Sequence, residues 1–307
     1  MVNKYIEGIC QEIFKKKVRL ILPEQNDSRI QTAQNRLSSM GINIININDY
    51  EDHSIYIKHI KNKKFTNNWT DDMLQDYVSS SLNKSLILLD LNYADCLVAG
   101  ATISSADVIK SSIRIIGLSK NTRWVSSCFF LVSPDGLNAY TYADCGVIPE
   151  PDTKQLVSIA YNAAMTHQLV AQEEPKIAFL SFSTNGSAEH YTVKKMRDAA
   201  SIFLEKYPDI LCEGEIQFDA AINPSVSKKK NKNSLLDGQA NVFIFPNLNA
   251  ANIAYKITQY LADYTAWGPL LNGFNKPVHD LSRGCSIDDI IYISLIAALN
   301  SKRVGVD

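Results

Sequence analysis

Short apolar runs alternate with longer amphipathic stretches along this chain. Residues 3–16 place apolar side chains at helical spacing, and Val18–Pro23 is an apolar run of strand length that a proline ends. A polar loop then leads into a predicted helix that stops at Gly41, and residues 42–47 form the next predicted strand. A strand, a helix and a strand at this spacing predict a parallel β-α-β unit.

The alternation continues to the end of the chain. It predicts two neighbouring strands, 125–132 and 139–144, joined by a turn at Pro134–Gly136, and a regular buried strand at 176–183. The last predicted helix begins at about residue 290 and is apolar at nearly every position, as a buried helix would be. The other predicted elements are a strand at 95–101 followed by a helix, helices at 152–171 and 191–206, a strand at 241–246, and a loop and helix over 247–260.

Composition places the chain among ordinary globular proteins. Its 307 residues suggest two domains, and 46% hydrophobic with 21% charged residues is enough to bury sizeable cores. The net charge of -1 argues against nucleic acid as a partner. The N-terminus is too polar for a signal peptide and no apolar run reaches the length of a membrane helix, so we expect a cytoplasmic protein.

The six cysteines are scattered and form no Cys-x-x-Cys pair, so the sequence predicts no metal site. Cys145 and Cys285 lie in predicted loops, but no histidine is adjacent to either in sequence, and we expect neither to be a nucleophile. Residues 49–83 are polar, include Lys61, Lys63 and Lys64, and are expected to form a solvated helical excursion.

The segment from Lys276 to Ile290 concentrates reactive side chains in what we expect to be a loop. Ser286 and Asp289 have the spacing of a capping box, which places Asp289 in the first turn of the last helix, where the helix dipole favours negative charge. This arrangement suits acyl or phosphoryl transfer: Arg283 would grip an oxyanion, Ser282 would donate to developing negative charge, and Asp289 would accept a proton. The alternative is a capped helix start alone, with Arg283 paired to a neighbouring aspartate, Asp280 or Asp288.

Two strand-to-helix turns are rich in small residues and hydroxyls. One carries Ser104 and Ser105 ahead of a helix with Lys110, and the other is Thr184–Ala188 after the strand at 176–183. Backbone N–H groups in such turns attract anions, so both are candidate phosphate cradles, although many α/β turns share this pattern.

Several motifs, in order, resemble those of the phosphotransacetylases, the phosphate acetyl/butyryltransferase family. The resemblance is dense from about residue 94 to 302 and thinner before. The motifs are Val98–Ala101, Ser104–Val108, Tyr142–Cys145, Leu180–Ala188, Gly214–Ala221, Asn241–Asn249 and Lys276–Ser286.

This resemblance implies a two-domain α/β fold with parallel-rich sheets, an isopropylmalate-dehydrogenase-like architecture and an active site in the cleft between the domains. It implies a discontinuous first domain, 1–132 plus 290–307, and a second domain, 133–289. The implied partners are coenzyme A and acetyl phosphate as substrates, with no cofactor, no nucleic acid and no membrane, and the protein is expected to be a homodimer.

The implied reaction is reversible transfer of an acetyl group between acetyl phosphate and coenzyme A by direct attack of the thiolate. Its catalytic residues would be Asp289, Ser282 and Arg283. The implied substrate-binding residues are Lys110, Ser104, Ser127, Ser183, Thr184, Gly186 and Ser187.

The chain departs from the family pattern at several positions. His279 replaces the usual Asn, Lys110 replaces an Arg, Ala251 and Ala254 replace glycines that are often present, and residues 53–90 are altered. Two alternatives therefore stay open: a phosphate butyryltransferase-like enzyme with a larger acyl pocket, and a non-catalytic homologue that only binds coenzyme A or a partner.

Overall fold

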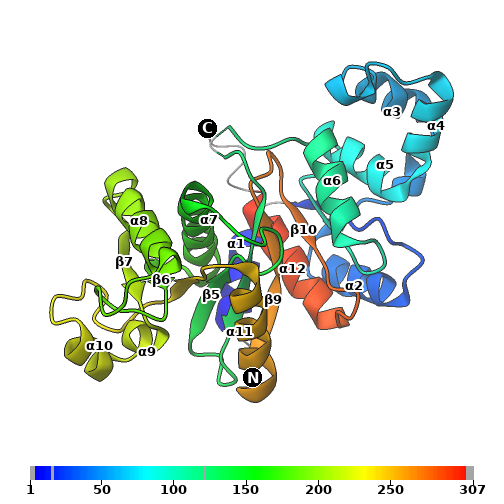
Figure 1. Cartoon of the computed structure of the whole chain (residues 1–307). Helices are drawn as coiled ribbons and strands as arrows, with labels where there is room; N and C mark the ends of the chain where they lie inside the picture. The colour runs from blue at the N-terminus through cyan, green and yellow to red at the C-terminus, as the bar shows by residue number, and fades with distance from the viewer. Residues whose placement is uncertain (1–3, 15–16, 121, 302–307) are drawn as a thin grey trace. The chain divides into compact units, whose positions relative to one another are not determined.

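The computed structural model describes residues 4–14, 17–120 and 122–301, and it is mixed α/β with parallel-rich sheets, as predicted (Figure 1). It divides into two compact units. The central unit is Ser126–Trp267, and the N-terminal unit comprises the described residues on either side of that range. These boundaries differ from the predicted ones at residues 132 and 289. The strand that begins at Ser126 belongs to the central sheet, and the 276–290 segment belongs to the N-terminal unit.

Parallel strands form the sheet of the N-terminal unit, in the order β10-β3-β1-β2. Helix α2 (Ser28–Ser39) connects the first two strands in the chain, so the predicted β-α-β unit is confirmed. Helix α12 (Ile287–Asn300) packs against α1 (Lys4–Ile13), α2 and β3, which explains its nearly continuous apolar sequence. The strands are β1 (Arg19–Ile21), β2 (Asn43–Ile44), β3 (Cys96–Ala99) and β10 (Val278–Asp280).

The prediction that the whole 276–290 segment is a loop is wrong, because Val278–Asp280 forms β10 beside β3. His279 is buried there. Its Nδ1 accepts a hydrogen bond from the Leu271 N–H at 3.1 Å, and its Nε2 lies 3.0 Å from the side-chain nitrogen of Asn300. Burial lowers the pKa of His279 to about 4, so this ring is neutral at pH 7.

Residues 49–83 form the helical excursion that we predicted, with α3 (His53–Ile60) and α4 (Asp71–Ser79). They pack on each other and on α5 (Ser81–Asp90), which in turn contacts β3 and α6 (Ser105–Ile115). Lys63 is an anchor of this excursion, since its Nζ donates to Asp90 Oδ2 at 2.5 Å and to the Ile115 carbonyl at 2.8 Å.

The sheet of the central unit has the order β7-β6-β8-β5-β4-β9. The predicted neighbours β4 and β5 pair antiparallel, and β5, β8, β6 and β7 run parallel. The prediction contained no strand at 265–272, where β9 lies. The strands are β4 (Ser126–Val132), β5 (Ala139–Ala143), β6 (Lys176–Leu180), β7 (Leu211–Ile216), β8 (Val242–Ile244) and β9 (Thr265–Asn272).

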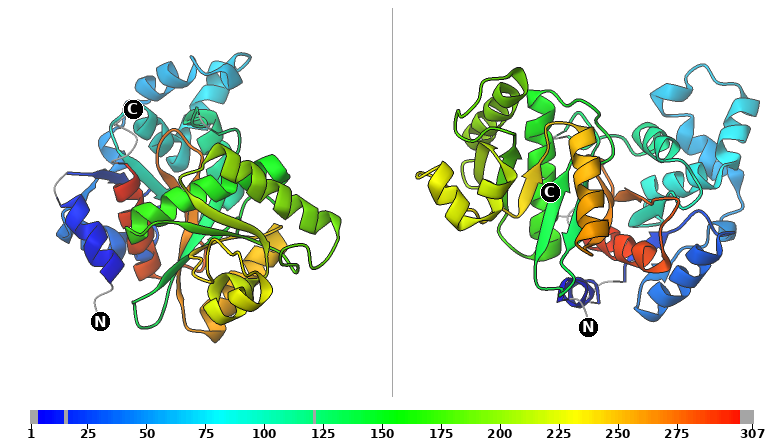
Figure 2. Two further views of the ribbon diagram at one scale, coloured as in Figure 1. Left: turned by 90° about the vertical axis from the view of Figure 1, so that its left-hand side faces the viewer. Right: turned by 60° about the horizontal axis from the view of Figure 1, so that its bottom comes forward.

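Successive side chains of β4 enter separate cores on the two faces of this sheet. Phe129 stacks on Tyr255 of α11, with ring centroids 4.1 Å apart, whereas Phe130 lies beside His167 of α7. The two helices can be followed on either side of the strands in Figure 2. The helices of this unit are α7 (Thr153–Ala171), α8 (Tyr191–Lys206), α9 (Phe218–Ile222), α10 (Pro224–Lys230) and α11 (Leu248–Leu261).

Candidate active site

The loop from Leu281 to Ser286 joins β10 to α12 and carries two of the three predicted catalytic residues. Its start is tied to the sheet, because the Leu281 N–H donates to the Ala99 carbonyl at 2.7 Å. Ser282 and Arg283 are exposed, whereas Cys285 is buried. The loop therefore presents a hydroxyl and a guanidinium to solvent from a fixed base.

The predicted capping box at the start of α12 is confirmed. Ser286 Oγ accepts from the Asp289 N–H at 3.1 Å, and Asp289 Oδ2 accepts from the N–H and Oγ of Ser286 at 2.8 Å each. The half-buried Asp289 carboxylate is thus held in the first helical turn, as expected.

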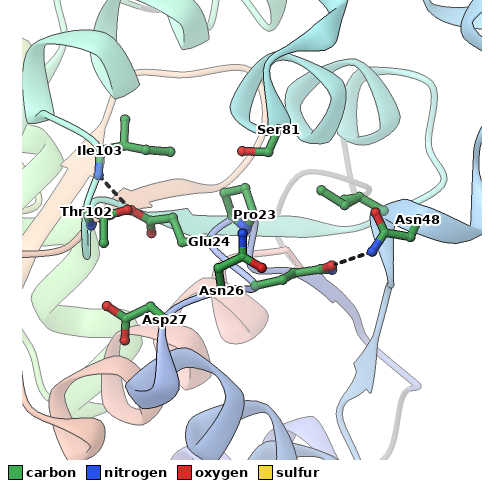
Figure 3. A pocket seen from close by; sticks show the side chains of 10 residues that line it. Pro23, Glu24, Asn26, Asp27, Asn48, Ser81, Thr102 and Ile103 are labelled. Carbon is green, nitrogen blue, oxygen red and sulfur yellow. Dashed lines mark hydrogen bonds between the residues drawn. The ribbon is translucent and has the colours of Figure 1, made fainter.

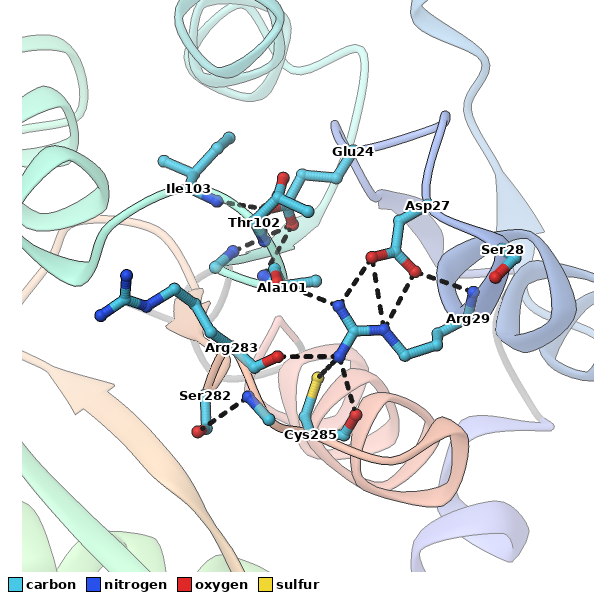
Figure 4. A network of polar contacts seen from close by, with 12 residues as sticks. Glu24, Asp27, Ser28, Arg29, Ala101, Thr102, Ile103, Ser282, Arg283 and Cys285 are labelled. Carbon is cyan, nitrogen blue, oxygen red and sulfur yellow. Dashed lines mark hydrogen bonds and ion pairs between the residues drawn. The ribbon is translucent and has the colours of Figure 1, made fainter.

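The alternative in which Arg283 pairs with Asp280 or Asp288 is wrong. Asp288 binds Arg36 instead, with oxygen and nitrogen 2.7 Å apart. Within the described part of the chain, the Arg283 side chain makes no hydrogen bond or ion pair, and its guanidinium points away from the polar network behind the loop (Figure 4). It is therefore free to bind an anionic ligand.

Asp280 closes β10 against the turn that precedes α6. Ser105 Oγ donates to its Oδ2 at 2.5 Å, and burial raises the pKa of this carboxyl to about 6. Gly100 makes the approach possible: its φ is +115°, and a Cβ there would lie 2.3 Å from Asp280 Oδ1. The turn and the Leu281–Ser286 loop are thus in direct contact.

The candidate cradle at this turn is already filled by a carboxylate of the chain. Glu24, which is buried, accepts from the N–H groups of Gly100, Ala101, Thr102 and Ile103 at 2.6 to 3.0 Å. Thr102 Oγ1 donates to it as well, at 3.0 Å. Glu24 therefore occupies the backbone N–H groups of Gly100 to Ile103, which this cradle would otherwise offer to a phosphate.

Ser104 and Lys110 lie on the helix that this turn begins. Ser104 caps α6: its Oγ accepts from the Asp107 N–H at 3.2 Å and donates to Asp107 Oδ2 at 2.7 Å. Lys110 is exposed and has no ion pair or hydrogen bond with the residues that the structure describes. Ser104 therefore has a structural partner, while the Lys110 ammonium is available.

Ser127, on β4 of the central unit, donates to the buried carboxylate of Asp144 through both its N–H and its Oγ. Asp144 also accepts from the N–H groups of Gly146, Val147 and Ile148 at 3.0 to 3.2 Å. Burial nevertheless raises the pKa of Asp144 above its ordinary value.

Glu215 fills the second candidate cradle, the loop after β6. It accepts from Ser183 Oγ at 3.0 Å, from the Gly186 N–H at 2.7 Å and from Arg197 Nε at 2.6 Å. Although burial acts to raise it, the ion pair and these hydrogen bonds hold the pKa of Glu215 below its ordinary value. Thr184 Oγ1 donates to Gln217, and Ser187 and Ser183 bond through their hydroxyls.

Three carboxylates thus organise the loops that carry most of the predicted binding residues: Glu24, Asp144 and Glu215. None of them is among the site residues predicted from the sequence, although Asp144 and Glu215 lie inside the motifs Tyr142–Cys145 and Gly214–Ala221 that carry the family resemblance. Within the N-terminal unit the structure brings the loop of Ser282 and Arg283 to the turn before α6. Ser127, Ser183, Thr184, Gly186 and Ser187 belong to the central unit.

A pocket of about 490 Å³ opens beside Glu24 in the N-terminal unit (Figure 3). It contains none of the predicted site residues, and its lining has two carboxylates and no basic side chain, so it does not suit a phosphate. The lining consists of Pro23, Glu24, Gln25, Asn26, Asp27, Ile47, Asn48, Ser81, Thr102 and Ile103.

Burial disfavours the reactive thiolate form of Cys145 and Cys285. Burial raises the pKa of Cys285 to about 11 and that of Cys145 well above its ordinary value, which disfavours the thiolate. Among the described residues, no cluster of three or more His, Cys, Asp or Glu side chains could hold a metal ion. Nor does any helix within those ranges have the length and apolar character needed to cross a bilayer.

Comparisons with known proteins agree across nearly the whole chain. Residues 9–298 match the family model described as "Phosphate acetyl/butaryl transferase". A phosphate acetyltransferase from Acetivibrio thermocellus is 35% identical over 299 residues, covering 95% of this chain and 89% of the relative. One from Bacillus subtilis is 36% identical over 315 residues, covering 94% and 97%.

A solved structure gives the same result. A phosphotransacetylase from Streptococcus pyogenes superposes with a TM-score of 0.91 at 32% identity, covering 99% of both chains.

Proposed function

The chain belongs to the phosphate acetyl/butyryltransferase family, and we propose that it transfers an acetyl group reversibly between acetyl phosphate and coenzyme A through the 281–289 region. It is therefore an acyltransferase. The observation that carries the proposal is the exposed Arg283 guanidinium, which has no partner among the described residues and stands beside Ser282 ahead of the capped Asp289.

The reaction is a direct displacement. Asp289 accepts the proton of the coenzyme A thiol, and the thiolate attacks the carbonyl carbon of acetyl phosphate. Ser282 donates to the oxyanion that develops, and the carbon–oxygen bond to phosphate breaks. The leaving phosphate takes the proton from Asp289, which restores the carboxylate, and it departs from its contact with Arg283. No covalent enzyme intermediate is needed, because binding both substrates together supplies much of the rate.

The phosphate group of acetyl phosphate needs positively charged side chains that have no other partner. We assign this contact to Arg283 and Lys110, because neither side chain has a hydrogen bond or ion pair with the residues that the structure describes. The other predicted binding residues already bond within the chain, so they shape the loops that carry the substrates. They are Ser104, Ser127, Ser183, Thr184, Gly186 and Ser187.

Acetyl rather than butyryl transfer agrees with the relatives, which are phosphate acetyltransferases. A non-catalytic role is not favoured, because Ser282, Arg283 and Asp289 are all present and Asp289 lies in the expected capping box. We further propose that coenzyme A is a substrate and that no cofactor takes part. The cytoplasmic location stays a prediction.

We also propose a homodimer. Helix α11 carries four apolar side chains on one side, at 53 to 81% exposure: Ile253, Ile257, Tyr260 and Leu261. Such a stripe is unusual on a monomer, and it fits pairing with a second copy of the chain.

Replacing Arg283 with Lys tests the proposed site. One ammonium cannot form the paired contact to phosphate, so we expect KM for acetyl phosphate to rise by about tenfold or more while KM for coenzyme A changes little. Arg36→Lys is the matched control, because Arg36 is exposed and binds Asp288, whose side chain has no proposed role in the reaction. If only KM for coenzyme A rose, Arg283 would contact coenzyme A and not acetyl phosphate, which would contradict the proposed role.

A further inference from the structure

The side chain of Arg29 lies behind the Leu281–Ser286 loop, and the loop atoms that it contacts are backbone carbonyls and the thiol of Cys285. Its NH1 donates to the Arg283 carbonyl at 2.9 Å and to the Cys285 carbonyl at 3.0 Å, and the Cys285 Sγ lies 3.8 Å away (Figure 4). Its NH2 donates to the Ala101 carbonyl at 3.0 Å. One guanidinium therefore joins the loop that carries Ser282 to the turn before α6.

Asp27 fixes the orientation of this guanidinium. As the N-cap of α2 it accepts from the Arg29 N–H at 2.8 Å, and it accepts from Arg29 Nε and NH2 at 3.1 and 2.6 Å. The ion pair is largely shielded, with side-chain exposures of 29% for Arg29 and 11% for Asp27. Asp27 thus orients the Arg29 guanidinium so that its N–H groups point at the carbonyls of Ala101, Arg283 and Cys285.

Glu24 lies in the same short segment as Asp27 and Arg29, and it binds the turn before α6. Its carboxylate gathers the N–H groups of the turn before α6, while Arg29 takes a carbonyl of that turn. The segment from Glu24 to Arg29 therefore fixes both the turn and the loop, although neither residue reaches toward the side chain of Ser282 or Arg283.

We propose that Arg29 is a positioning residue for acetyl transfer, which sets the place of Ser282 and Arg283 by holding the backbone between them and α12. This inference rests on the roles proposed above for those two residues. Lysine cannot replace Arg29, because a single ammonium cannot reach carbonyls on two separate loops in fixed directions.

The test compares Arg29→Lys and Arg29→Gln with Arg36→Gln. Arg36 is on the same helix and also contacts α12, but it binds the exposed Asp288 side chain and no carbonyl of the loop. For both Arg29 variants we expect kcat to fall by about tenfold or more, since a misplacement of about 1 Å can cost about 100-fold. Arg36→Gln is expected to keep kcat within about twofold of the unmodified protein.

Hydrogen exchange supplies a readout that does not depend on turnover. In the Arg29 variants we expect amides of residues 282–286 to exchange faster by roughly tenfold, while those of β3, in the same unit, keep their protection. Unchanged exchange in the loop, or a normal kcat, would overturn the inference. So would equal loss of protection in β3, because Arg29 would then support the whole unit.

Failure of the inference and failure of the proposed function can be told apart. If Arg283→Lys lowers activity and the Arg29 variants do not, the proposed site stands and Arg29 has no positioning role. If Arg283→Lys leaves both KM values and kcat unchanged, the proposed site itself is wrong.

Discussion

At the scale of single residues, two buried histidines make the stability of this protein depend on pH. His167 in α7 and His279 in β10 each have a pKa lowered to about 4 because burial disfavours the charged ring. The unfolded chain binds a proton at each site below about pH 6.5, while the folded chain stays neutral down to about pH 4. The contribution of each neutral histidine to the free energy of unfolding is therefore fully present above the pKa of the unfolded chain. It is lost as the pH falls toward the pKa of the folded protein.

The variant His279→Asn measures how much of the pH-dependent loss of stability is due to His279. Between pH 7 and pH 5 we expect His279 to account for about 2 kcal/mol of the stability that is lost. Urea unfolding at both pH values should show a loss that is smaller by this amount in His279→Asn. His190→Asn, which changes an exposed side chain, is the control. Equal losses in the unmodified protein and in His279→Asn would show that His279 does not stay neutral in the folded state.

Local chemistry made some site residues predictable and left others hidden. Ser286 and Asp289 could be paired from spacing alone, because a capping box lies within one helical turn. Glu24 could not be placed, because its partners begin 76 positions along the chain. The strand at Val278–Asp280 was missed for the same reason, since its pairing with β3 is long-range and its sequence contains buried polar residues.

At the scale of elements, the same device recurs in both units: one buried carboxylate gathers the donors of a loop that follows a strand. Glu24 does this before α6, Asp144 after β5 and Glu215 after β6. Because the internal carboxylates satisfy the backbone donors, the loops are held in place without a ligand. This agrees with our proposal that side chains such as Arg283 supply the positive charge for substrate binding.

The start of α12 combines a cap with the proposed base, and two variants separate these roles. Asp289→Asn keeps the shape but removes the base, so we expect kcat to fall by about 100-fold or more. Ser286→Ala removes the hydroxyl from the cap and is expected to cost about 1 kcal/mol of stability, while the Asp289 carboxylate remains and keeps the hydrogen bond from the backbone N–H at position 286. Similar kcat losses in both variants would mean that Asp289 acts through the helix start alone. Initial rates at saturating substrates and thermal unfolding give the two quantities.

At the scale of the whole molecule, the apolar stripe of α11 predicts association. Light scattering should give twice the chain mass of 34.3 kDa for the unmodified protein. Ile257→Glu, which places a charge in the middle of the stripe, should give the mass of a single chain. Ile202→Glu, at an exposed position of α8 in the same unit, is the control and should keep the double mass. A double mass for Ile257→Glu would assign the contact to another surface.

The central claim is acetyl transfer to coenzyme A, and one assay tests it directly. Purified protein is mixed with coenzyme A and, in turn, acetyl, propionyl and butyryl phosphate, and thioester formation is followed by absorbance. We expect rapid thioester formation that is fastest with acetyl phosphate. Preference for butyryl phosphate would contradict the assigned substrate, and no thioester from any acyl phosphate would contradict the assigned reaction.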